Sequence, residues 1–507
     1  AKKDSSYKTY VRKNVFIKSK KGRFRNRVVY RLNRIKPGLL YNEQDYFKTI
    51  NQYTRTASWQ QVDVLDSVYN NEDSVKHVDI SLFLTQAKKF SFKTDLEASQ
   101  NIGRGTIEAL TGSFFGISLT SSLLDRNFAR SAIQWSSNIR GGLEVNSQGT
   151  SIEKDLFQTI QASAGTTFSV PRLWPPFNKW IRRADVGRTF FNINGSYTKR
   201  KDFYELRNAN TSFGYEWKKK NNIWTINLLN IEFVNVDKTD SLNKVLENNA
   251  VLKYAFNQGL VMSLAASFQK YIFYKKKPNQ SSYFRIAAEE SGGLLGNIIF
   301  KKNLLRFAKI DAEFRHYITF SRHKYAFRFI GGYGRSFDDS TTLPFFRQFI
   351  AGGPNSMRAW PLRQLGLGNS LTQDTSSSNY KDRLGDIYLE ANAEYRFNMF
   401  KLFGFSVEGA LFTDVGNIWN RKLKTNPTND GVFSFKNLYR DLAVDGGFGI
   451  RWDFNYLRAR FDIAYKLKDP VREGNGWLKR FEWKSANRTG TIENTNIALQ
   501  IGIDYPF

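Results

Sequence analysis

The sequence predicts a mainly β protein in which a small α/β domain precedes an antiparallel transmembrane β-barrel. Apolar and polar residues alternate with a period of two over most of the chain, helical periodicity is confined to its first part, and an alternating segment ends on an aromatic residue. Such alternation is typical of strands that face lipid on one side and a wet lumen on the other. We place the α/β domain, with its basic N-terminal segment, over 1–88 and the barrel over 89–507.

The first part combines helix and strand signals. A short helix is expected to start within Val28–Asn33. Asn42 is a suitable N-cap for a second helix over 43–55, whose aromatic residues share one face. A strand begins at Val62, and the alternation over 78–84 predicts another. Two helices and a small sheet make a compact domain.

The barrel strands are expected from four segments in which the alternation is clearest: 191–197, 308–315, 387–397 and 457–465. A soluble sandwich explains them less well, because it seldom sustains strands of about 10 residues with charges placed so regularly. Lipid-facing strands of ~9–11 residues fit them directly. Closure into a barrel also removes the sheet edges, which lipid does not tolerate.

The end of the chain predicts a last amphipathic strand. Apolar residues run from Ile497 through Ile503 to Tyr505 and Phe507 at every second position. The chain therefore stops on an aromatic residue in the apolar, outward register. Such an ending looks like the recognition signal of bacterial outer-membrane proteins, with Tyr505 and Phe507 as its aromatic residues.

The composition agrees with a barrel and excludes other classes. The chain has 43 Phe and 24 Tyr, which suits aromatic girdles at the two membrane interfaces. Its mean hydropathy is −0.49, and no run approaches the roughly 18–20 apolar residues that a membrane-spanning helix needs. The absence of Cys excludes a disulfide framework and thiolate metal sites. Residue 1 is Ala with no apolar signal segment before it, so we expect a processed or trimmed chain.

The formal net charge is +30, with an excess of basic residues before Glu43. Nucleic-acid binding is one interpretation of such a charge. Elsewhere, however, the basic residues are spread along the chain. We therefore expect a solvated basic surface near lipid head groups or lipopolysaccharide, and no nucleic-acid partner.

The segment 343–360 carries the most informative motif, Gly352-Gly353 followed by Ser356, Arg358 and an aromatic Trp360. It follows a strand and precedes a long polar loop. Together with Phe412-Thr413-Asp414-Val415-Gly416, it resembles the BamA/TamA family, in which the first pattern lies in the sixth extracellular loop and the second in a barrel strand. The resemblance covers nearly the whole chain, most sharply 305–507, and the first region is similar to a single POTRA domain.

The strand alternation adds a physical expectation to this resemblance. It places Leu411 on the outward face and Asp414 on the inward face, and Glu394 of the preceding strand also points inward. Arg suits such a site, because its planar guanidinium binds carboxylates in a bidentate way and stays charged when desolvated. The resemblance implies that Arg358 anchors loop six inside the barrel against Asp414 and Glu394, with Gly352 and Gly353 permitting the bend.

The resemblance further implies a 16-stranded barrel in the outer membrane of a Gram-negative bacterium, with the first domain in the periplasm. Its first and last strands close weakly, and the seam admits client strands by β-augmentation and passes them into a locally thinned bilayer. The implied partners are client outer-membrane or secreted proteins, outer-membrane lipid, and accessory lipoproteins or a periplasm-spanning partner. Ala359 and Trp360 depart from the family pattern, which favours a TamA/TamL-like branch over BamA.

Two other function classes remain as alternatives: a diffusion porin or receptor barrel, and a two-partner-secretion-type transporter of one cognate protein. An enzyme is not expected. The three histidines, His77, His316 and His323, form no metal-ligand pattern, and neither a G-x-S-x-G elbow nor a P-loop is present. We expect no catalytic residue, no metal site and no cofactor.

Overall fold

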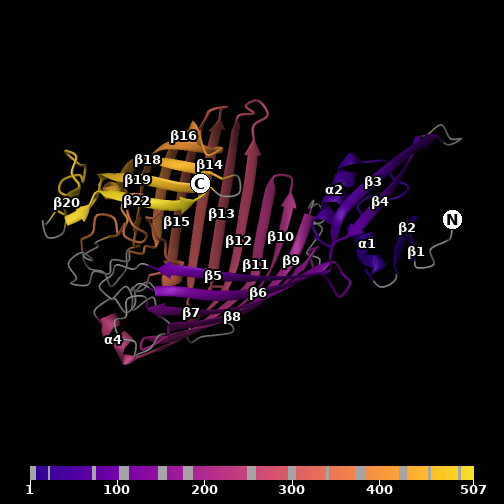
Figure 1. Cartoon of the computed structure of the whole chain (residues 1–507), viewed down its shortest axis with the longest axis horizontal. Helices are drawn as coiled ribbons and strands as arrows, with labels where there is room; N and C mark the ends of the chain where they lie inside the picture. The colour runs from indigo at the N-terminus through magenta and orange to yellow at the C-terminus, as the bar shows by residue number, and fades with distance from the viewer. Residues whose placement is uncertain are drawn as a thin grey trace. The chain divides into compact units, whose positions relative to one another are not determined.

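The structure is a computed structural model. It describes residues 7–20, 23–70, 76–101, 114–146, 157–174, 186–247, 258–294, 304–337, 342–371, 383–421, 431–454, 458–488 and 493–507. The described residues are dominated by a 16-stranded antiparallel sheet, preceded by a small α/β region, as the sequence predicts (Figure 1).

The N-terminal region holds two helices and two hairpins. Its elements are β1 (Tyr7–Arg12), β2 (Val15–Lys20), α1 (Asn26–Leu32), α2 (Glu43–Thr54), β3 (Trp59–Asn70) and β4 (Lys76–Gln86). Both predicted helices are present, and the Asn42 side chain caps α2 by accepting a hydrogen bond from the Gln44 backbone N–H (2.9 Å). The hairpin of β1 and β2 was not expected, because basic residues interrupt its alternation.

Aromatic side chains form the core of this region. The Tyr53 ring meets the Trp59 ring edge-on at 5.1 Å, and Phe24 stacks on Trp59 at 4.8 Å. Tyr53 is buried and its hydroxyl donates to the Val29 carbonyl (2.7 Å), which joins α2 to α1. This burial raises the pKa of the Tyr53 phenol, so its hydroxyl stays protonated and remains a donor.

The sheet order runs from β22 through β19 and on, strand by strand, to β5. The described strands belong to two compact units, β5–β11 with the N-terminal region and β12–β22. Those of the first unit are β5 (Phe90–Asn101), β6 (Phe114–Phe128), β7 (Ile133–Asn146), β8 (Phe157–Val170), β9 (Val186–Arg200), β10 (Tyr204–Lys219) and β11 (Asn222–Lys238). Those of the second are β12 (Gly259–Phe273), β13 (Gln280–Ser291), β14 (Phe307–Thr319), β15 (His323–Ser336), β16 (Ile387–Leu402), β17 (Phe405–Trp419), β18 (Ala443–Asp453), β19 (Arg458–Lys468) and β22 (Ile497–Ile503).

Short elements lie in the connections. They are α4 (Asp240–Glu247), the 3-10 turns η2 (Phe345–Arg347) and η3 (Phe435–Asn437), α7 (Leu438–Asp441), β20 (Lys484–Ala486) and β21 (Glu493–Thr495). None of the helices in the described residues is both long enough and apolar enough to cross a membrane.

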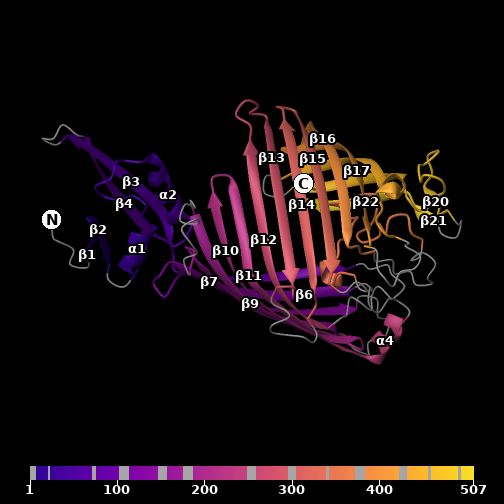
Figure 2. The ribbon, with the colours of Figure 1, turned by 180° about the vertical axis from the view of Figure 1, so that it is seen from behind.

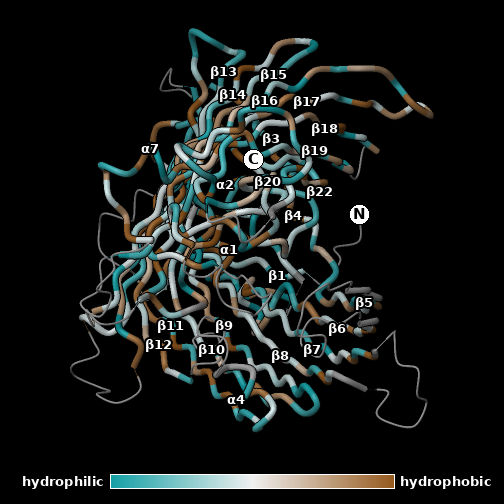
Figure 3. Tube along the Cα trace, turned by 90° about the vertical axis from the view of Figure 1, so that its left-hand side faces the viewer, coloured by the Kyte–Doolittle hydropathy of each residue, from teal (hydrophilic) through white to brown (hydrophobic). Residues whose placement is uncertain are grey.

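The second unit buries its polar face and exposes its apolar one. In β16, which lies between β15 and β17 (Figure 2), Glu390 and Glu394 are 4% and 2% exposed, whereas the alternate residues from Ile387 to Tyr395 are only partly buried. Ile310 in β14 and Leu411 in β17 are 44% and 51% exposed. A soluble protein has the opposite arrangement. Hydrophobic and hydrophilic residues are accordingly mixed along the strands rather than gathered into long apolar runs (Figure 3).

The last strand differs from the expected one. β22 ends at Ile503, and Asp504 has a positive φ of 63° that turns the chain. The expectation that Tyr505 and Phe507 continue the strand on its outward face is therefore wrong. Phe507 is buried, because the turn directs these two residues toward charged side chains of the sheet.

Candidate functional site

The connection between β15 and β16 returns to the polar face of the second unit. Met357, Ala359, Trp360, Leu365 and Leu367 of this loop pack in one buried cluster. Its other members include sheet residues, which are Tyr388, Phe412, Ile418, Ala443 and Ala464. We call residues 342–371 the inner loop. The rest of the long polar loop, up to Lys381, lies outside the described residues.

Arg358, at the tip of the inner loop, contacts both carboxylates expected from the sequence. Its Nε and Nη2 atoms donate to the two oxygens of Asp414 at 2.8 and 2.9 Å, and its Nη1 donates to Glu394 Oε2 at 2.8 Å. The guanidinium lies over the Phe412 ring, with Cζ 3.4 Å from the centroid. Arg358 is only 1% exposed. Burial by itself lowers the pKa of this guanidinium, but Asp414 and Glu394 outweigh it and raise the pKa above its ordinary value, so the charge is retained.

A wider set of buried charges surrounds this contact. In the described part of the chain it comprises five arginines, Arg328, Arg358, Arg396, Arg451 and Arg460, and five carboxylates, Glu390, Glu394, Asp414, Asp445 and Asp462. Glu394 alone accepts from three of the arginines, at 2.8 Å from Arg358, 2.9 Å from Arg396 and 3.1 Å from Arg451. Because an unpaired buried charge is costly, these pairings between arginines and carboxylates offset part of the cost of burying them.

The two glycines of the motif give the inner loop its bend. Gly352 and Gly353 have φ values of 97° and 88°, which other residues rarely adopt. A Cβ on Gly352 would lie 2.3 Å from the Pro361 carbonyl oxygen, so a side chain does not fit there. Ser356 closes the bend, because its hydroxyl accepts from the Gly352 N–H (3.2 Å) and donates to Glu390.

Ala359, which departs from the family pattern, fits its position without strain. Its φ is not positive, its side chain is buried, and its N–H donates to Asp445 Oδ2 at 3.0 Å. The next residue, Trp360, is also buried, with Lys466 Nζ 5.1 Å from its ring centroid. Gln500 of β22 donates to the Arg358 carbonyl at 3.0 Å. The inner loop is thus tied to the last strand as well as to β16 and β17.

Sequence reasoning missed several members of the site. Asp445, Arg451 and Asp462 were not singled out, although alternation had already put Asp462 on a polar face. Arg451 Nη1 donates to Asp462, and Arg358 Nη1 lies 3.6 Å from Asp462 Oδ2. Parity along the strands could have placed these residues inside, but it does not say which of them meet.

Tyr505 and Phe507 lie beside the same charges. The Tyr505 hydroxyl donates to Glu408 Oε2 at 2.5 Å, and its ring has the Arg396 and Arg458 guanidinium carbons 3.9 and 4.1 Å from its centroid. Arg396 Nη2 donates to the Phe507 carbonyl oxygen at 3.1 Å. Arg396 therefore connects Glu394, a partner of Arg358, to the end of the chain.

The three histidines make contacts of other kinds. His77 stacks on Tyr69, His316 Nδ1 is 2.8 Å from the Ser282 hydroxyl, and His323 packs on Phe320. No group of three or more His, Cys, Asp or Glu side chains able to hold a metal ion occurs in the described ranges.

Sixteen antiparallel strands, an outward apolar face and an inner loop held by a buried arginine define a transmembrane β-barrel of the outer-membrane class. The Omp85 superfamily domain matches residues 111–502, which is most of the chain. The chain therefore belongs to the Omp85 superfamily, and a barrel of this fold implies the outer membrane of a Gram-negative bacterium.

Solved structures agree with this fold. BamA from Haemophilus ducreyi lacking POTRA domains 1-3 matches with a TM-score of 0.57 at 14% identity, over 98% of this chain and 89% of that one. CdiB from Acinetobacter baumannii matches with a TM-score of 0.52 at 11% identity, over 95% of this chain and 72% of that one. At such identities the likeness shows the fold alone. No curated protein sequence matches the chain. The choice between the TamA-like and BamA branches stays a prediction.

Proposed function

We propose that this barrel inserts client proteins into the outer membrane or exports them across it, through a weak seam between its first and last strands. The N-terminal region acts as a POTRA-like domain on the periplasmic side and receives the clients. The free energy comes from client folding, so no cofactor is needed and the protein is not an enzyme.

The observation that carries this proposal is the burial of Arg358 against Asp414 and Glu394. A diffusion porin needs an open lumen, whereas here the inner loop packs on the polar face of β16–β19. The side chains that line a water-filled pore stay hydrated, whereas the five arginines of this site are buried and lose hydration free energy. A loop that is fixed inside the lumen by buried charges fits a barrel that handles polypeptides better than one that passes solutes.

The last strand supports a weak seam. β22 has 7 residues and is the shortest of the sixteen. At ~3.4 Å per residue and a tilt of ~40°, 7 residues span about 18 Å, whereas the apolar band of an outer-membrane barrel is ~25 Å tall. A strand this short can make few backbone hydrogen bonds across the seam, so a client strand that pairs there by β-augmentation competes with few bonds. It also suits a bilayer that is thinned beside it.

The first test replaces Arg358 with Ala in the full chain. We expect client assembly to fall at least tenfold and the inner loop to become sensitive to protease. The reason is that Asp414 and Glu394 lose a buried cationic partner, a change that typically costs about 3–5 kcal/mol. Arg188→Ala is the matched control, because Arg188 is an exposed arginine with one ion pair, to Glu216 at 2.8 Å. Unchanged assembly together with unchanged loop protection in Arg358→Ala would overturn the anchoring role.

Depletion of the protein separates the function classes. Loss of many outer-membrane proteins from the envelope, measured by quantitative proteomics, is the expected result for an assembly factor. Loss of one secreted protein would instead favour the two-partner-secretion alternative. Loss of uptake of one solute, with the envelope proteins unchanged, would favour a porin or receptor.

A further inference from the structure

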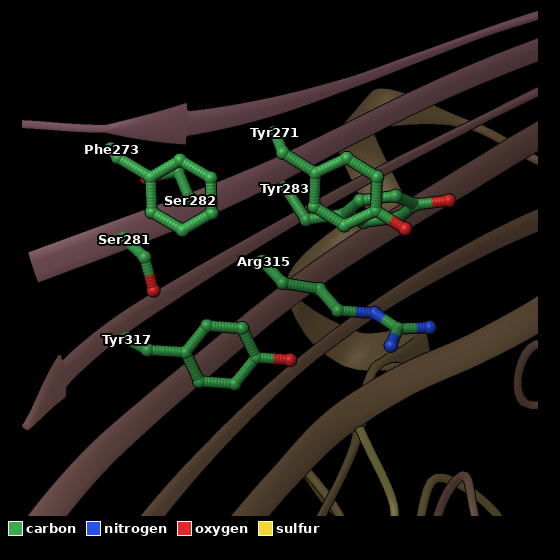
Figure 4. Close-up of a pocket in the computed structure, with 7 residues that line it drawn as sticks. All are labelled: Tyr271, Phe273, Ser281, Ser282, Tyr283, Arg315 and Tyr317. Atoms are coloured by element: carbon green, nitrogen blue, oxygen red, sulfur yellow. The ribbon is translucent and has the colours of Figure 1, made fainter. Parts of the chain in front are cut away.

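A pocket of about 240 Å³ lies where β12, β13 and β14 come together, near the turn that joins β12 to β13 (Figure 4). Its lining includes the side chains of Tyr271, Phe273, Ser281, Tyr283, Arg315 and Tyr317. Arg315 is paired across β14 and β15 with Arg328, and Arg328 with Asn392 of β16, which places the pocket on the polar inner face of the sheet. The pocket is distinct from the Arg358 contact, and the proposed function does not use it.

Rings and cations alternate along this face. Tyr271 and Tyr283 have centroids 5.1 Å apart, and the Arg315 guanidinium carbon is 5.3 Å from the Tyr283 centroid. Lys324 Nζ lies 4.6 Å from the Tyr317 centroid and 5.8 Å from that of Tyr505. The row of rings and cations therefore leads from the pocket to the chain's own C-terminal residues.

One end of this row is occupied by the chain's own Tyr505, and that contact indicates what the pocket at the other end binds. There the Tyr505 ring lies against Arg396 and Arg458, and the neighbouring Asp504 carboxylate is 3.1 Å from Arg458 Nη1. An aromatic side chain beside a carboxylate is thus held by rings and cations of the sheet. The pocket offers the same groups, and cation–π contact is attractive wherever a cation faces a ring.

The volume of the pocket and the charge around it restrict the kind of ligand further. The volume of about 240 Å³ is below the roughly 300 Å³ at which pockets for whole small molecules begin, so it suits one large side chain. The turn between β12 and β13 carries three exposed lysines, Lys275, Lys276 and Lys277. Together with Arg315 and Lys324 they outnumber the two nearby carboxylates, Glu313, which pairs with Arg315 at 2.7 Å, and Glu408, which accepts from the Tyr505 hydroxyl. The surroundings favour a segment that carries a carboxylate.

We propose that this pocket binds an aromatic side chain, next to a carboxylate, of an extended client polypeptide segment on the inner face of the barrel. The inference rests on the proposed function in one respect only, that unfolded clients reach this face. Binding at the pocket is a step before insertion and does not need the seam to open.

The test uses the purified full chain in lipid nanodiscs and a dye-labelled peptide with the sequence of residues 501–507, followed by fluorescence anisotropy. We expect Tyr283→Ala to weaken binding about tenfold, since a ring and its cation contact are lost. Tyr325→Ala is the matched control, because Tyr325 is a partly exposed tyrosine on the opposite face of β15. A peptide with Ala in place of both aromatic residues should bind at least tenfold more weakly.

A second variant keeps the test decisive if Tyr283→Ala does not fold. Ser281→Trp fills the pocket without removing any ring, and it should abolish peptide binding. A photoreactive phenylalanine in place of the peptide's tyrosine should form adducts within β12–β14. Equal binding by Tyr283→Ala and Tyr325→Ala, or adducts confined to β16 and β17, would overturn the proposal. The proposed function would then still stand or fall with Arg358→Ala, which leaves the pocket intact.

Discussion

Arg358 shows how one side chain can hold a loop of some thirty described residues. Its fork of donors meets both oxygens of Asp414 and one of Glu394, and its flat face covers Phe412. Lys has a single ammonium group and cannot make the bidentate contact. The site is therefore built for arginine in particular, and not for positive charge in general.

For substitutions at Ala359 and Gly352 we predict opposite effects on the inner loop. Ala359→Gly should keep assembly and cost at most ~1 kcal/mol of stability, because the position has ordinary φ and Gly only loosens the unfolded chain. Gly352→Ala should expose the inner loop, because its φ of 97° is strained for Ala and its Cβ would meet Pro361. Protease digestion of the folded barrel measures how exposed the inner loop is in each variant. If Ala359→Gly were the more damaging change, the description of this bend would be wrong.

Among the elements, the N-terminal region is joined to the β6–β7 turn within its own compact unit. Asn127 is 3% exposed; its Nδ2 donates to the Arg23 carbonyl (2.7 Å), and its Oδ1 accepts from the Ala132 N–H (3.0 Å). Gln134 Nε2 also donates to the Thr56 carbonyl at 2.8 Å. One amide side chain thus shapes the turn and holds the preceding region.

Asn127→Ala should loosen this junction. The variant removes the Asn127 partner of the Arg23 carbonyl and of the buried Ala132 N–H, a loss of about 1–3 kcal/mol. Limited proteolysis should then release fragments from 1–88 at lower protease concentration, while the barrel stays folded. Asn221→Ala, at an exposed position in the β10–β11 turn, is the control. Equal digestion of the two variants would show that other contacts hold the region.

The short last strand makes a prediction for hydrogen exchange. Backbone amides of β22 should exchange at least tenfold faster than those of β14 or β16. Its ladder with β19 covers only residues 497–503, whereas β14 and β16 are 13 and 16 residues long and each pairs with two neighbouring strands. Mass spectrometry of the exchanged protein in nanodiscs measures this difference. Protection of β22 equal to that of β16 would argue against a weak seam.

For the whole molecule, the net charge of +30 predicts salt-dependent binding to anionic lipid. Much of the basic excess lies at exposed positions, such as the three lysines of the β12–β13 turn. Binding of the full chain to vesicles that contain lipopolysaccharide should weaken at least tenfold between 50 and 500 mM salt, because the Debye length shortens to a few ångströms. Cosedimentation measures it. Salt-independent binding would show that apolar contacts dominate.

The local parts of the fold could be predicted from the sequence because they depend on neighbouring residues. Asn42 before Glu43 predicted the start of α2, and the alternation over 387–397 predicted β16 and its inward polar face. The β1–β2 hairpin and the turn at Asp504 could not be predicted in this way. The hairpin is local, but basic residues interrupt its alternation. The turn at Asp504 depends on contacts made after the chain has folded, such as Tyr505 with Glu408 and Arg396.

The same division applies to the candidate site. By itself, the sequence determined that the chain forms an outer-membrane barrel, because lipid outside and water inside impose a period of two that any strand must repeat. The motif around Arg358, with its resemblance, selected Asp414 and Glu394 as partners for the inner loop. Only the tertiary structure decided that Arg396, Arg451 and Asp462 complete the charge network and that Phe507 turns inward. Contacts such as Arg451 with Glu394 and Arg396 with Phe507 join residues far apart in the chain. Charge pairing in a buried space depends on distances that no local pattern encodes.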